Sequence, residues 1–555
     1  MLLKLRSEEA WFGGRSPAST GRRRVARAIL GALLALPLLA NPPFATPDRR
    51  RLKNAWEVRN EVTVPPGSEM AVKDYFLSFR DYQELVLYDS KAGYYSSGRV
   101  SFVQDYYTFP NMLDPWFGRM IAVQVFKMWD GMRRAGTLGP RDQFTIVEFG
   151  GGNGELARSI LGFISDEGQK DSMGPWLEFW QQLMYVSYDR SPAMVAEQRV
   201  RNSAAGGKFE AREGDATDPG SLMAAGSIKG VVLSNEMVDN FCVHKVILSV
   251  DGPAEVAFVA PTLPPALWSR LAKLVPEPLR RLIEDDDRVI RNRFFHDAPA
   301  GERWLSRASF VALLEWLASL SDYPSRVNSM IFHEIYVPAR VIPELADHLR
   351  RYARPYACEL ARLDRDTVAY IDLDERKFIE GVGHILKAGY VLTIDYGSNW
   401  EGMLAPGPFS HLRSYGPGHG RSNPYRDASL NDITTDVNFS LVAAEGRSVG
   451  LYTAFFGRQR ALQAGTSIKL NELPPDQTDI DAHARQYNLR VEYFKSSRAF
   501  KLLVQQKENT DASYVYPDPN REPLDVNEAN LRPFQRNRAA EIEKRLSAAV
   551  ALASR

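Results

Sequence analysis

The stretch Phe144–Leu161 reads FTIVEFGGGNGELARSIL, which predicts a buried strand, a glycine-rich turn and the start of a helix. An apolar and β-branched run leads into Glu148, and Leu156, Ile160 and Leu161 recur at helical spacing. Glycines at the start of a helix let the backbone turn sharply and approach a ligand closely. The stretch therefore predicts a bound, nucleotide-like cofactor.

The glycine spacing bears on which cofactor this is. A dinucleotide loop reads GxGxxG, with an acid about twenty residues further on. Counted from Gly150 the third glycine position is Glu155, and counted from Gly152 it is Ala157, a register without an acidic strand end at the right distance. NAD is thus the weaker alternative. The pattern acid-x-Gly-x-Gly-x-Gly over 148–154 resembles the first motif of class I S-adenosylmethionine-dependent methyltransferases, although a glycine turn without a ligand has a similar sequence.

Composition limits the remaining possibilities. A chain of 555 residues holds one large domain with additions, or two to three domains. Lysine and arginine total 69 against 68 acidic residues, so no overall charge favours nucleic acid or an acidic membrane. The two cysteines, Cys242 and Cys358, form no disulfide framework and have no metal-ligand spacing. We expect a reducing compartment, no nucleic-acid partner and no metal.

The first fifty residues resemble a leader. Arg22–Arg24 precede an apolar run over 28–40 that is too short to span a bilayer. Residues 1–50 are interpreted as a leader or a disordered extension, and stable membrane association is not expected. Since S-adenosylmethionine is kept in the cytosol and the organelle matrix, we expect a cytoplasmic or mitochondrial-matrix enzyme, with export as the alternative.

Strands and helices alternate along the middle of the chain, which predicts an α/β fold with a doubly wound, Rossmann-like parallel sheet. After Phe144, the expected strands are Leu183–Tyr188, Lys208–Arg212, Gly230–Ser234, Tyr390–Ile394, Leu489–Phe494 and Ala499–Gln505. Around this sheet we expect a helical N-terminal region at 68–140, with helices over 72–87 and 115–129. The core would comprise 141–250 and 377–507 with an insertion at 399–458. An inserted cap that contains helical pieces would span 251–376, and a linker and amphipathic helix would occupy 508–555.

Acids at the strand ends are candidate cofactor ligands. Asp189 ends the second strand, where an acid accepts hydrogen bonds from both ribose hydroxyls. Asp215 follows the third strand, where methyltransferases commonly use an aspartate to meet the adenine amino group. The alternatives are a helix cap for Asp189 and a plain turn for Asp215.

The exit of the fourth strand, Asn235-Glu236-Met-Val-Asp239, carries two acids three residues apart. In a helix they share one face. Methyl transfer is an in-line displacement that depends on aligning the nucleophile and removing water. A guanidinium nucleophile stays charged near neutral pH, so it needs carboxylates to orient it and to take its proton. Glu236 and Asp239 are therefore candidate catalytic residues, and a dipole-favoured acid pair at a helix start is the alternative.

Several segments in this order resemble the MidA family of methyltransferases, which includes the mitochondrial complex I assembly factor 7 enzymes, from about Val72 to Gln505. The matching segments are Asp74-Tyr75 with Gly93-Tyr94-Tyr95, Asp105 to Pro110 with Phe117-Gly118, Glu148 to Leu161, Asn235 to Asp239 with Val243-His244-Lys245, Ile394-Asp395-Tyr396-Gly397, and Asp432 to Phe439. The resemblance implies a class I methyltransferase fold and symmetric dimethylation of arginine on a complex I subunit.

The expected site follows from the strand ends and the resemblance together. Expected cofactor-binding residues for S-adenosylmethionine are Glu148, Gly150, Gly152, Gly154, Asp189, Asp215 and Asn235, and expected catalytic residues are Glu236, Asp239 and Asp395. Asp395 would help to position the acceptor, and a plain strand-terminating aspartate is its alternative.

Departures from the family pattern lie at Phe109, Asn111, Asn240-Phe241-Cys242 and Asn438, near the expected acceptor side. A protein substrate is the expected partner. A small-molecule acceptor and a catalytically silent scaffold that retains the fold are the alternatives.

Overall fold

The computed structural model describes residues 61–96, 100, 108–296, 301–320, 329–405, 411–416, 419–421, 423–470, 480–510, 514–525 and 528–548. The predicted leader at 1–50 lies outside these ranges, as do residues 105–107 of one family segment. Across the described ranges, no helix combines the length and the apolar character needed to cross a bilayer.

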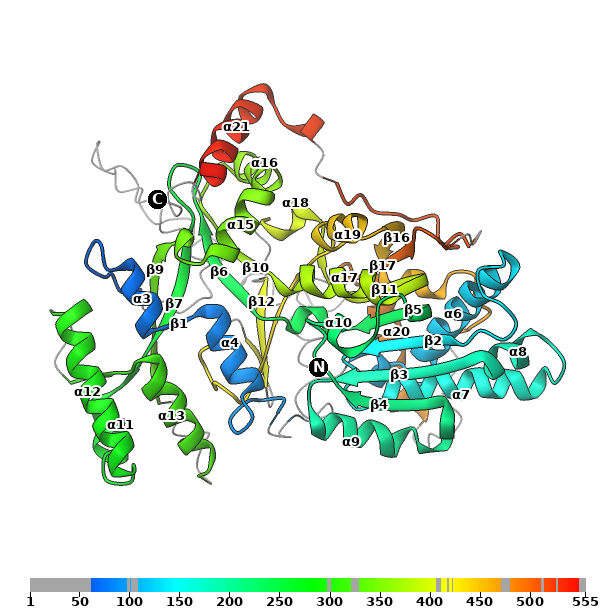
Figure 1. Cartoon of the computed structure of the whole chain (residues 1–555), viewed down its shortest axis with the longest axis horizontal. Coiled ribbons are helices and arrows are strands. Elements are labelled where there is room, and N and C mark those ends of the chain that lie inside the picture. The colour runs from blue at the N-terminus through cyan, green and yellow to red at the C-terminus, as the bar shows by residue number, and fades with distance from the viewer. Residues whose placement is uncertain are drawn as a thin grey trace, which may run out of the picture.

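The larger described sheet has eight strands in the order β16-β17-β11-β5-β2-β3-β4, with β15 beside β11 (Figure 1). Their bounds are β2 (Phe144–Phe149), β3 (Leu183–Asp189), β4 (Phe209–Glu213), β5 (Ile228–Asn235), β11 (Leu386–Ser398), β15 (Val437–Asn438), β16 (Leu451–Arg458) and β17 (Phe500–Lys507). Strands β4, β3, β2, β5 and β11 pair in parallel, whereas β17 is antiparallel to both neighbours. The predicted doubly wound α/β sheet is confirmed.

The order of the strands predicts where a ligand crevice lies. From β2 the chain moves outward to β3 and β4 and then returns to β5 on the other side of β2. In open α/β sheets, ligands bind outside the carboxyl ends of the strands where the order reverses. The crevice is therefore expected at the ends of β2 and β5, which carry Glu148 and Asn235.

The central strand β2 is buried along its whole length because helices cover both faces of the sheet. Ile146 packs into one apolar cluster with α6 and α7, while Val147 packs into another with α17 and α19. The helices that flank the sheet are α6 (Trp116–Arg134), α7 (Glu155–Lys170), α8 (Pro175–Gln182), α9 (Pro192–Arg201), α10 (Pro219–Leu222), α17 (Asp374–Ile385), α19 (Phe439–Ser448) and α20 (Ile480–Ser496).

A second sheet occupies much of the segment for which the sequence predicted a helical cap. Its order is β1-β7-β6-β10, and β8 and β9 both pair with β7. The bounds are β1 (Leu77–Ser78), β6 (Val243–Leu248), β7 (Glu255–Leu263), β8 (Arg303–Trp304), β9 (Ile331–Pro338) and β10 (Thr367–Asp372). The segment 251–376 therefore contains strands that the sequence did not predict, and Pro261 lies within one of them, β7.

Helices pack around this second sheet (Figure 1). They are α3 (Glu69–Tyr75), α4 (Phe79–Tyr88), α11 (Pro265–Leu271), α12 (Glu277–Phe294), α13 (Arg307–Ala318), α15 (Pro343–Arg351), α16 (Ala353–Leu363) and α21 (Pro533–Ala548). The single helix expected over 72–87 is interrupted by β1, and Ser78 caps the second half by accepting a hydrogen bond from the Asp81 amide at 3.1 Å. The C-terminal helix α21 buries Ala539, Ile542 and Leu546.

Two further expectations about the end of the core were wrong. Leu489–Phe494 is not a strand but part of α20, in which Tyr487, Val491 and Phe494 are buried at helical spacing. A short apolar run does not distinguish a buried strand from a buried helix. The second antiparallel strand is instead β16, which the sequence assigned to the insertion at 399–458.

The segment 399–458 therefore divides into an added part and a core part. The added part carries α18 (Trp400–Met403) and a small antiparallel sheet of β12 (Leu412–Gly416), β13 (His419–Arg421) and β14 (Asp432–Thr435). The core part comprises β15, α19 and β16.

Candidate functional site

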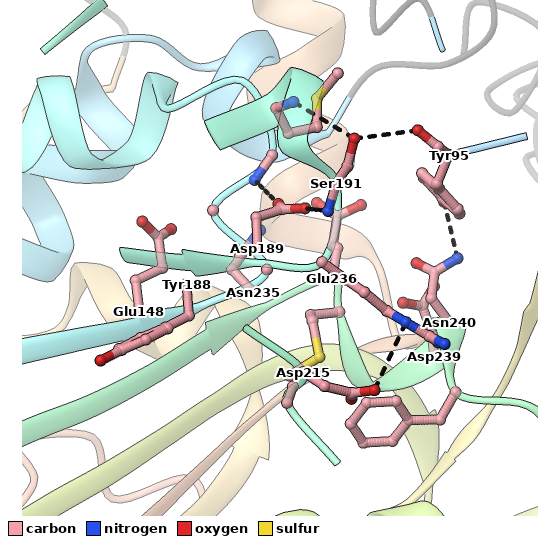
Figure 2. A pocket seen from close by; sticks show the side chains of 18 of the residues that line it. Tyr95, Glu148, Tyr188, Asp189, Ser191, Asp215, Asn235, Glu236, Asp239 and Asn240 are labelled. Carbon is pink, nitrogen blue, oxygen red and sulfur yellow. Dashed lines mark hydrogen bonds and ion pairs between the residues drawn. The ribbon is translucent and has the colours of Figure 1, made fainter. Parts of the chain in front are cut away.

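The glycine turn lies where the sequence placed it, between β2 and α7. Gly150, Gly152 and Gly154 have φ of +74°, +52° and +79°, the left-handed region that L side chains rarely adopt. Gly150 and Gly152 line a cavity at the carboxyl edge of the sheet (Figure 2), whereas Gly154 does not. The turn therefore requires glycine for its backbone conformation, independently of any ligand.

Gly154 has a packing role. It precedes the first residue of α7, and a Cβ built there would lie 2.7 Å from Asn202 Nδ2 and 3.0 Å from the Cα of Gln198. Asn202 Nδ2 donates to the Gly154 carbonyl at 3.1 Å. Gly154 thus allows α7 to approach α9 closely, and contact with a cofactor stays a prediction.

Asp189 ties the glycine turn to the end of β3. One carboxylate oxygen accepts from the Gly152 amide at 3.0 Å, and the other accepts from the Ser191 amide at 2.9 Å (Figure 2). Burial raises the pKa of Asp189 to about 6, although the backbone hydrogen bonds counteract this increase. Asp189 also lines the cavity, and its contact with a ribose stays a prediction.

Glu148 is buried beneath the turn and is 2 % exposed. Its carboxylate accepts from Tyr185 Oη at 2.9 Å and from Ser187 Oγ at 3.4 Å. Burial, with a smaller contribution from the negative charge of Asp189, raises the pKa of Glu148 to about 7. Near neutral pH, Glu148 is therefore poised between its charged and neutral forms.

Asp215 and Asn235 complete the expected cofactor set in the cavity wall. Asp215 is partly exposed and accepts from the Thr217 amide and hydroxyl, both at 2.8 Å. Asn235 Oδ1 is buried and has no hydrogen-bond partner among the described residues. An unpaired buried polar atom in a cavity wall is costly unless a ligand satisfies it.

Glu236 follows β5 in a strained conformation, with φ of +49°. Its amide donates to the Ile394 carbonyl at 2.8 Å, and its carboxylate accepts from the Phe109 amide at 2.9 Å and from Tyr396 Oη at 3.2 Å. A left-handed conformation at a non-glycine residue persists only where the surroundings enforce it. Glu236 is therefore held in one orientation in the cavity wall.

Asp395, which the sequence suggested would help to position the acceptor, is not among the residues that line the cavity. It is fully buried in β11, and it accepts from the amides of Met237 and Asp239, both at 3.2 Å. Burial first, and then the charge of Glu236, raise the pKa of Asp395 to about 8. Asp395 shapes the loop that presents Glu236 and Asp239, both of which line the cavity.

Helix α4 forms a wall of the cavity that the sequence did not predict. Arg190 pairs with Glu84 of α4, lies 4.4 Å over the ring of Tyr88, and approaches Asp215 at 3.6 Å. Burial would lower the pKa of Arg190, but its ion pair with Glu84 raises it overall. Arg190 thus connects the expected cofactor side, at Asp215, to a helix of the second sheet region.

The residues that the sequence missed were Glu84, Tyr88, Tyr95, Arg190 and Asp432. Tyr95 and Asp432 stood within family segments, but those segments assigned them no role. Glu84, Tyr88 and Arg190 had no signal of their own, because only the packing of the second sheet region against the strand ends makes them neighbours.

The residues present fit an adenosine cofactor with an amino-acid tail. The left-handed glycine turn, the Asp189 carboxylate and the unpaired Asn235 oxygen face one cavity, and α7 begins beside it. A helix N-terminus favours negative charge such as a carboxylate. Within the described ranges, no group of three or more His, Cys, Asp or Glu side chains has a metal-binding arrangement.

Comparison with known proteins identifies the family and the fold of the chain. A family model described as "Putative S-adenosyl-L-methionine-dependent methyltransferase" matches residues 120–456, more than half of the chain. No curated protein matches the chain. Two solved structures from Burkholderia thailandensis, one bound to S-adenosyl-homocysteine and one native and described as uncharacterized, each align with a TM-score of 0.50 and 19% identity, covering 82% of this chain and 93% of theirs. Together these matches confirm the predicted class I methyltransferase fold.

Proposed function

The chain belongs to this family of S-adenosyl-L-methionine-dependent methyltransferases, and from that premise we propose that its acceptor is the guanidinium group of an arginine in a protein substrate. S-adenosylmethionine is the cofactor. The acceptor, the product and the partner are the proposal.

The charge of the cavity wall carries this proposal. Its acidic members are Glu84, Glu148, Asp189, Asp215, Glu236, Asp239, Asp374 and Asp432. In the part of the wall that the structure describes, Arg190 is the one lysine, arginine or histidine. A cavity lined by one sign of charge attracts ligands of the opposite sign. The wall therefore favours a cationic acceptor over a phosphate or a carboxylate.

Glu236 and Asp239 are the residues proposed to act on the acceptor. S-adenosylmethionine supplies an electrophilic methyl group when it is bound. The two carboxylates hold the guanidinium in line and localise its positive charge, and one of them receives the proton that the methylated nitrogen releases. Tyr396 keeps Glu236 oriented by donating to it.

The family resemblance supports the finer parts of the proposal. It favours symmetric dimethylarginine as the product, a protein such as a complex I subunit as the partner, and the cytoplasm or mitochondrial matrix as the compartment. A small-molecule acceptor is the second candidate, because the departures at Asn111, Asn240 and Cys242 all line the cavity.

A labelled-methyl assay tests this function. The purified chain is incubated with dialysed cell extract and S-adenosylmethionine carrying a tritiated methyl group, and the protein and metabolite fractions are separated. Label recovered as methylarginine after acid hydrolysis of the protein supports the proposal. Label confined to metabolites rejects a protein acceptor, and label in another protein residue rejects arginine.

A further inference from the structure

Three side chains from distant segments form a closed hydrogen-bonded triangle in the cavity wall. Tyr95 Oη donates to Asp432 Oδ1 at 2.8 Å, and Asn240 Nδ2 donates to the same oxygen at 2.7 Å. Asn240 Nδ2 also donates to Tyr95 Oη at 2.9 Å, as Figure 2 shows. All three residues line the cavity, and Asp432 is 2 % exposed.

The triangle is braced on one side. Tyr88 Oη donates to the Asn240 carbonyl at 3.0 Å, and the ring of Tyr88 stacks on that of Tyr95 at 5.6 Å between centroids. A buried carboxylate costs free energy unless hydrogen bonds or opposite charge compensate for its lost hydration. Tyr95 and Asn240 provide two such hydrogen bonds, so Asp432 is kept as an acceptor group in the wall.

The position of the triangle places it on the acceptor side. Asn240 directly follows Asp239, the second proposed acceptor carboxylate, and none of the three residues contacts the glycine turn through a described hydrogen bond.

We propose that Asp432 is a specificity-determining carboxylate for a cationic acceptor, and that Asn240 is the residue that positions it. This inference rests on the proposed function and adds to it. The charge of Asp432 strengthens acceptor binding, and the amide of Asn240 keeps that charge turned towards the acceptor. Neither residue acts on the cofactor.

The test compares the full-length chain with Asp432→Asn, Asn240→Ala and Tyr95→Phe. Asp432→Asn keeps the shape and removes the charge, Asn240→Ala removes the positioning amide, and Tyr95→Phe removes one hydrogen bond. Asp285→Asn, at an exposed carboxylate on α12, is the matched control. Tritiated-methyl transfer is measured against increasing concentrations of dialysed extract, and S-adenosyl-homocysteine affinity is measured by calorimetry.

We expect Asp432→Asn to raise the extract concentration for half-maximal transfer at least about tenfold, since a lost charged contact is typically worth that much. Asn240→Ala should raise it about threefold to fivefold and Tyr95→Phe about twofold, while affinity for S-adenosyl-homocysteine stays within about twofold in every variant. A purely structural triangle would lower stability and maximal rate without this change in half-saturation.

Two results would overturn the inference while leaving the function intact: unchanged half-saturation in Asp432→Asn, or a parallel loss of S-adenosyl-homocysteine affinity. If Asp432→Asn does not fold, Asn240→Ala is used instead, because it retains the charge of Asp432. Unchanged half-saturation in Asn240→Ala, or a parallel loss of S-adenosyl-homocysteine affinity, would then overturn the inference. A wild-type chain that binds S-adenosyl-homocysteine but labels nothing in the extract overturns the proposed function and this inference with it.

Discussion

The cofactor side and the acceptor side of the cavity differ in the sequence separation of the residues that hydrogen bonds join. On the cofactor side, the hydrogen bond that fixes the glycine turn joins Gly152 to Asp189, which are 37 residues apart. On the acceptor side, Glu236 is fixed by Phe109 and Tyr396 at separations of 127 and 160 residues, and Asn240 reaches Asp432 across 192.

This difference suggests that the two sides change separately, except where Arg190 joins Asp215 to α4 and where the Ser191 hydroxyl donates to the Tyr95 carbonyl at 3.1 Å. The expected cofactor side is built from the ends of four strands, β2, β3, β4 and β5, all of which lie between residues 144 and 235. The acceptor side depends on segments from the second sheet region and from the small β12–β14 sheet, so insertions there change its wall directly. Substitutions on one side should therefore leave binding on the other side intact.

The largest expected effect comes from Gly152→Arg. Arginine is strained at φ of +52°, and its side chain would fill the turn. We expect affinity for S-adenosyl-homocysteine, measured by calorimetry, to fall at least about a hundredfold. The matched control is Gly162→Arg on α7, where an added Cβ meets nothing within 4 Å. Unchanged affinity in Gly152→Arg would contradict the assignment of the turn as the cofactor cradle.

On the acceptor side, Glu236→Gln should have the opposite pattern. It removes a charge proposed to orient the acceptor while keeping the shape of the side chain, so we expect methyl transfer to fall about a hundredfold with cofactor affinity within about twofold. Glu541→Gln, at an exposed position on α21, is the control. If Glu236→Gln and Asp239→Asn both bind cofactor and fully replace the wild-type chain in a deletion strain, the protein is a silent scaffold.

The buried acid of the cofactor side predicts a pH effect on stability. Between the ordinary Glu148 pKa of 4.5 and its folded pKa of about 7, the folded state binds more protons than the unfolded state. The free energy of unfolding therefore falls as pH rises through this window. Glu148→Gln lacks this group, so the free energy of unfolding of the variant minus that of the wild type should rise by about 2 kcal/mol from pH 5 to pH 7. Urea unfolding of the cofactor-free proteins measures this difference.

Asp189 and Asp395 titrate in both proteins of that comparison, so the difference reports Glu148 together with its electrostatic coupling to Asp189. Parallel stability curves for the variant and the wild type would show that Glu148 keeps an ordinary pKa. The exposed Glu541→Gln should leave the slope unchanged.

The smallest effect is expected from Tyr396→Phe. This variant removes the 3.2 Å hydrogen bond to Glu236 but leaves the Glu236 bond to the Phe109 amide. A hydrogen bond to a charged group is worth about 1.5 kcal/mol or more, so methyl transfer should fall about tenfold without loss of cofactor affinity. Tyr452→Phe, at a residue that is 52% exposed, should change neither. A loss as large as that of Glu236→Gln would give Tyr396 a role of its own.

Prediction from sequence succeeded where the signal was periodic and local. The strands that end at Glu148, Asp189 and Asn235 were expected because both faces of a parallel sheet are buried and its strands are continuously apolar. It failed at Leu489–Phe494, where a short apolar run is ambiguous, and in the second sheet, where β1, β9 and β10 pair with strands far away in the sequence that no local pattern identifies.

The sequence by itself determined the cofactor side, because a strand, three left-handed glycines and a strand-end acid lie within a short length of chain and need little else to form. Only the tertiary structure decided the acceptor side. In the folded protein, Asp395 lies behind the loop that carries Glu236 and Asp239, and α4 contacts Arg190. Tyr95, Asn240 and Asp432 form hydrogen bonds with one another in the cavity wall. Those contacts depend on how separate layers pack, and packing is a property of the whole chain.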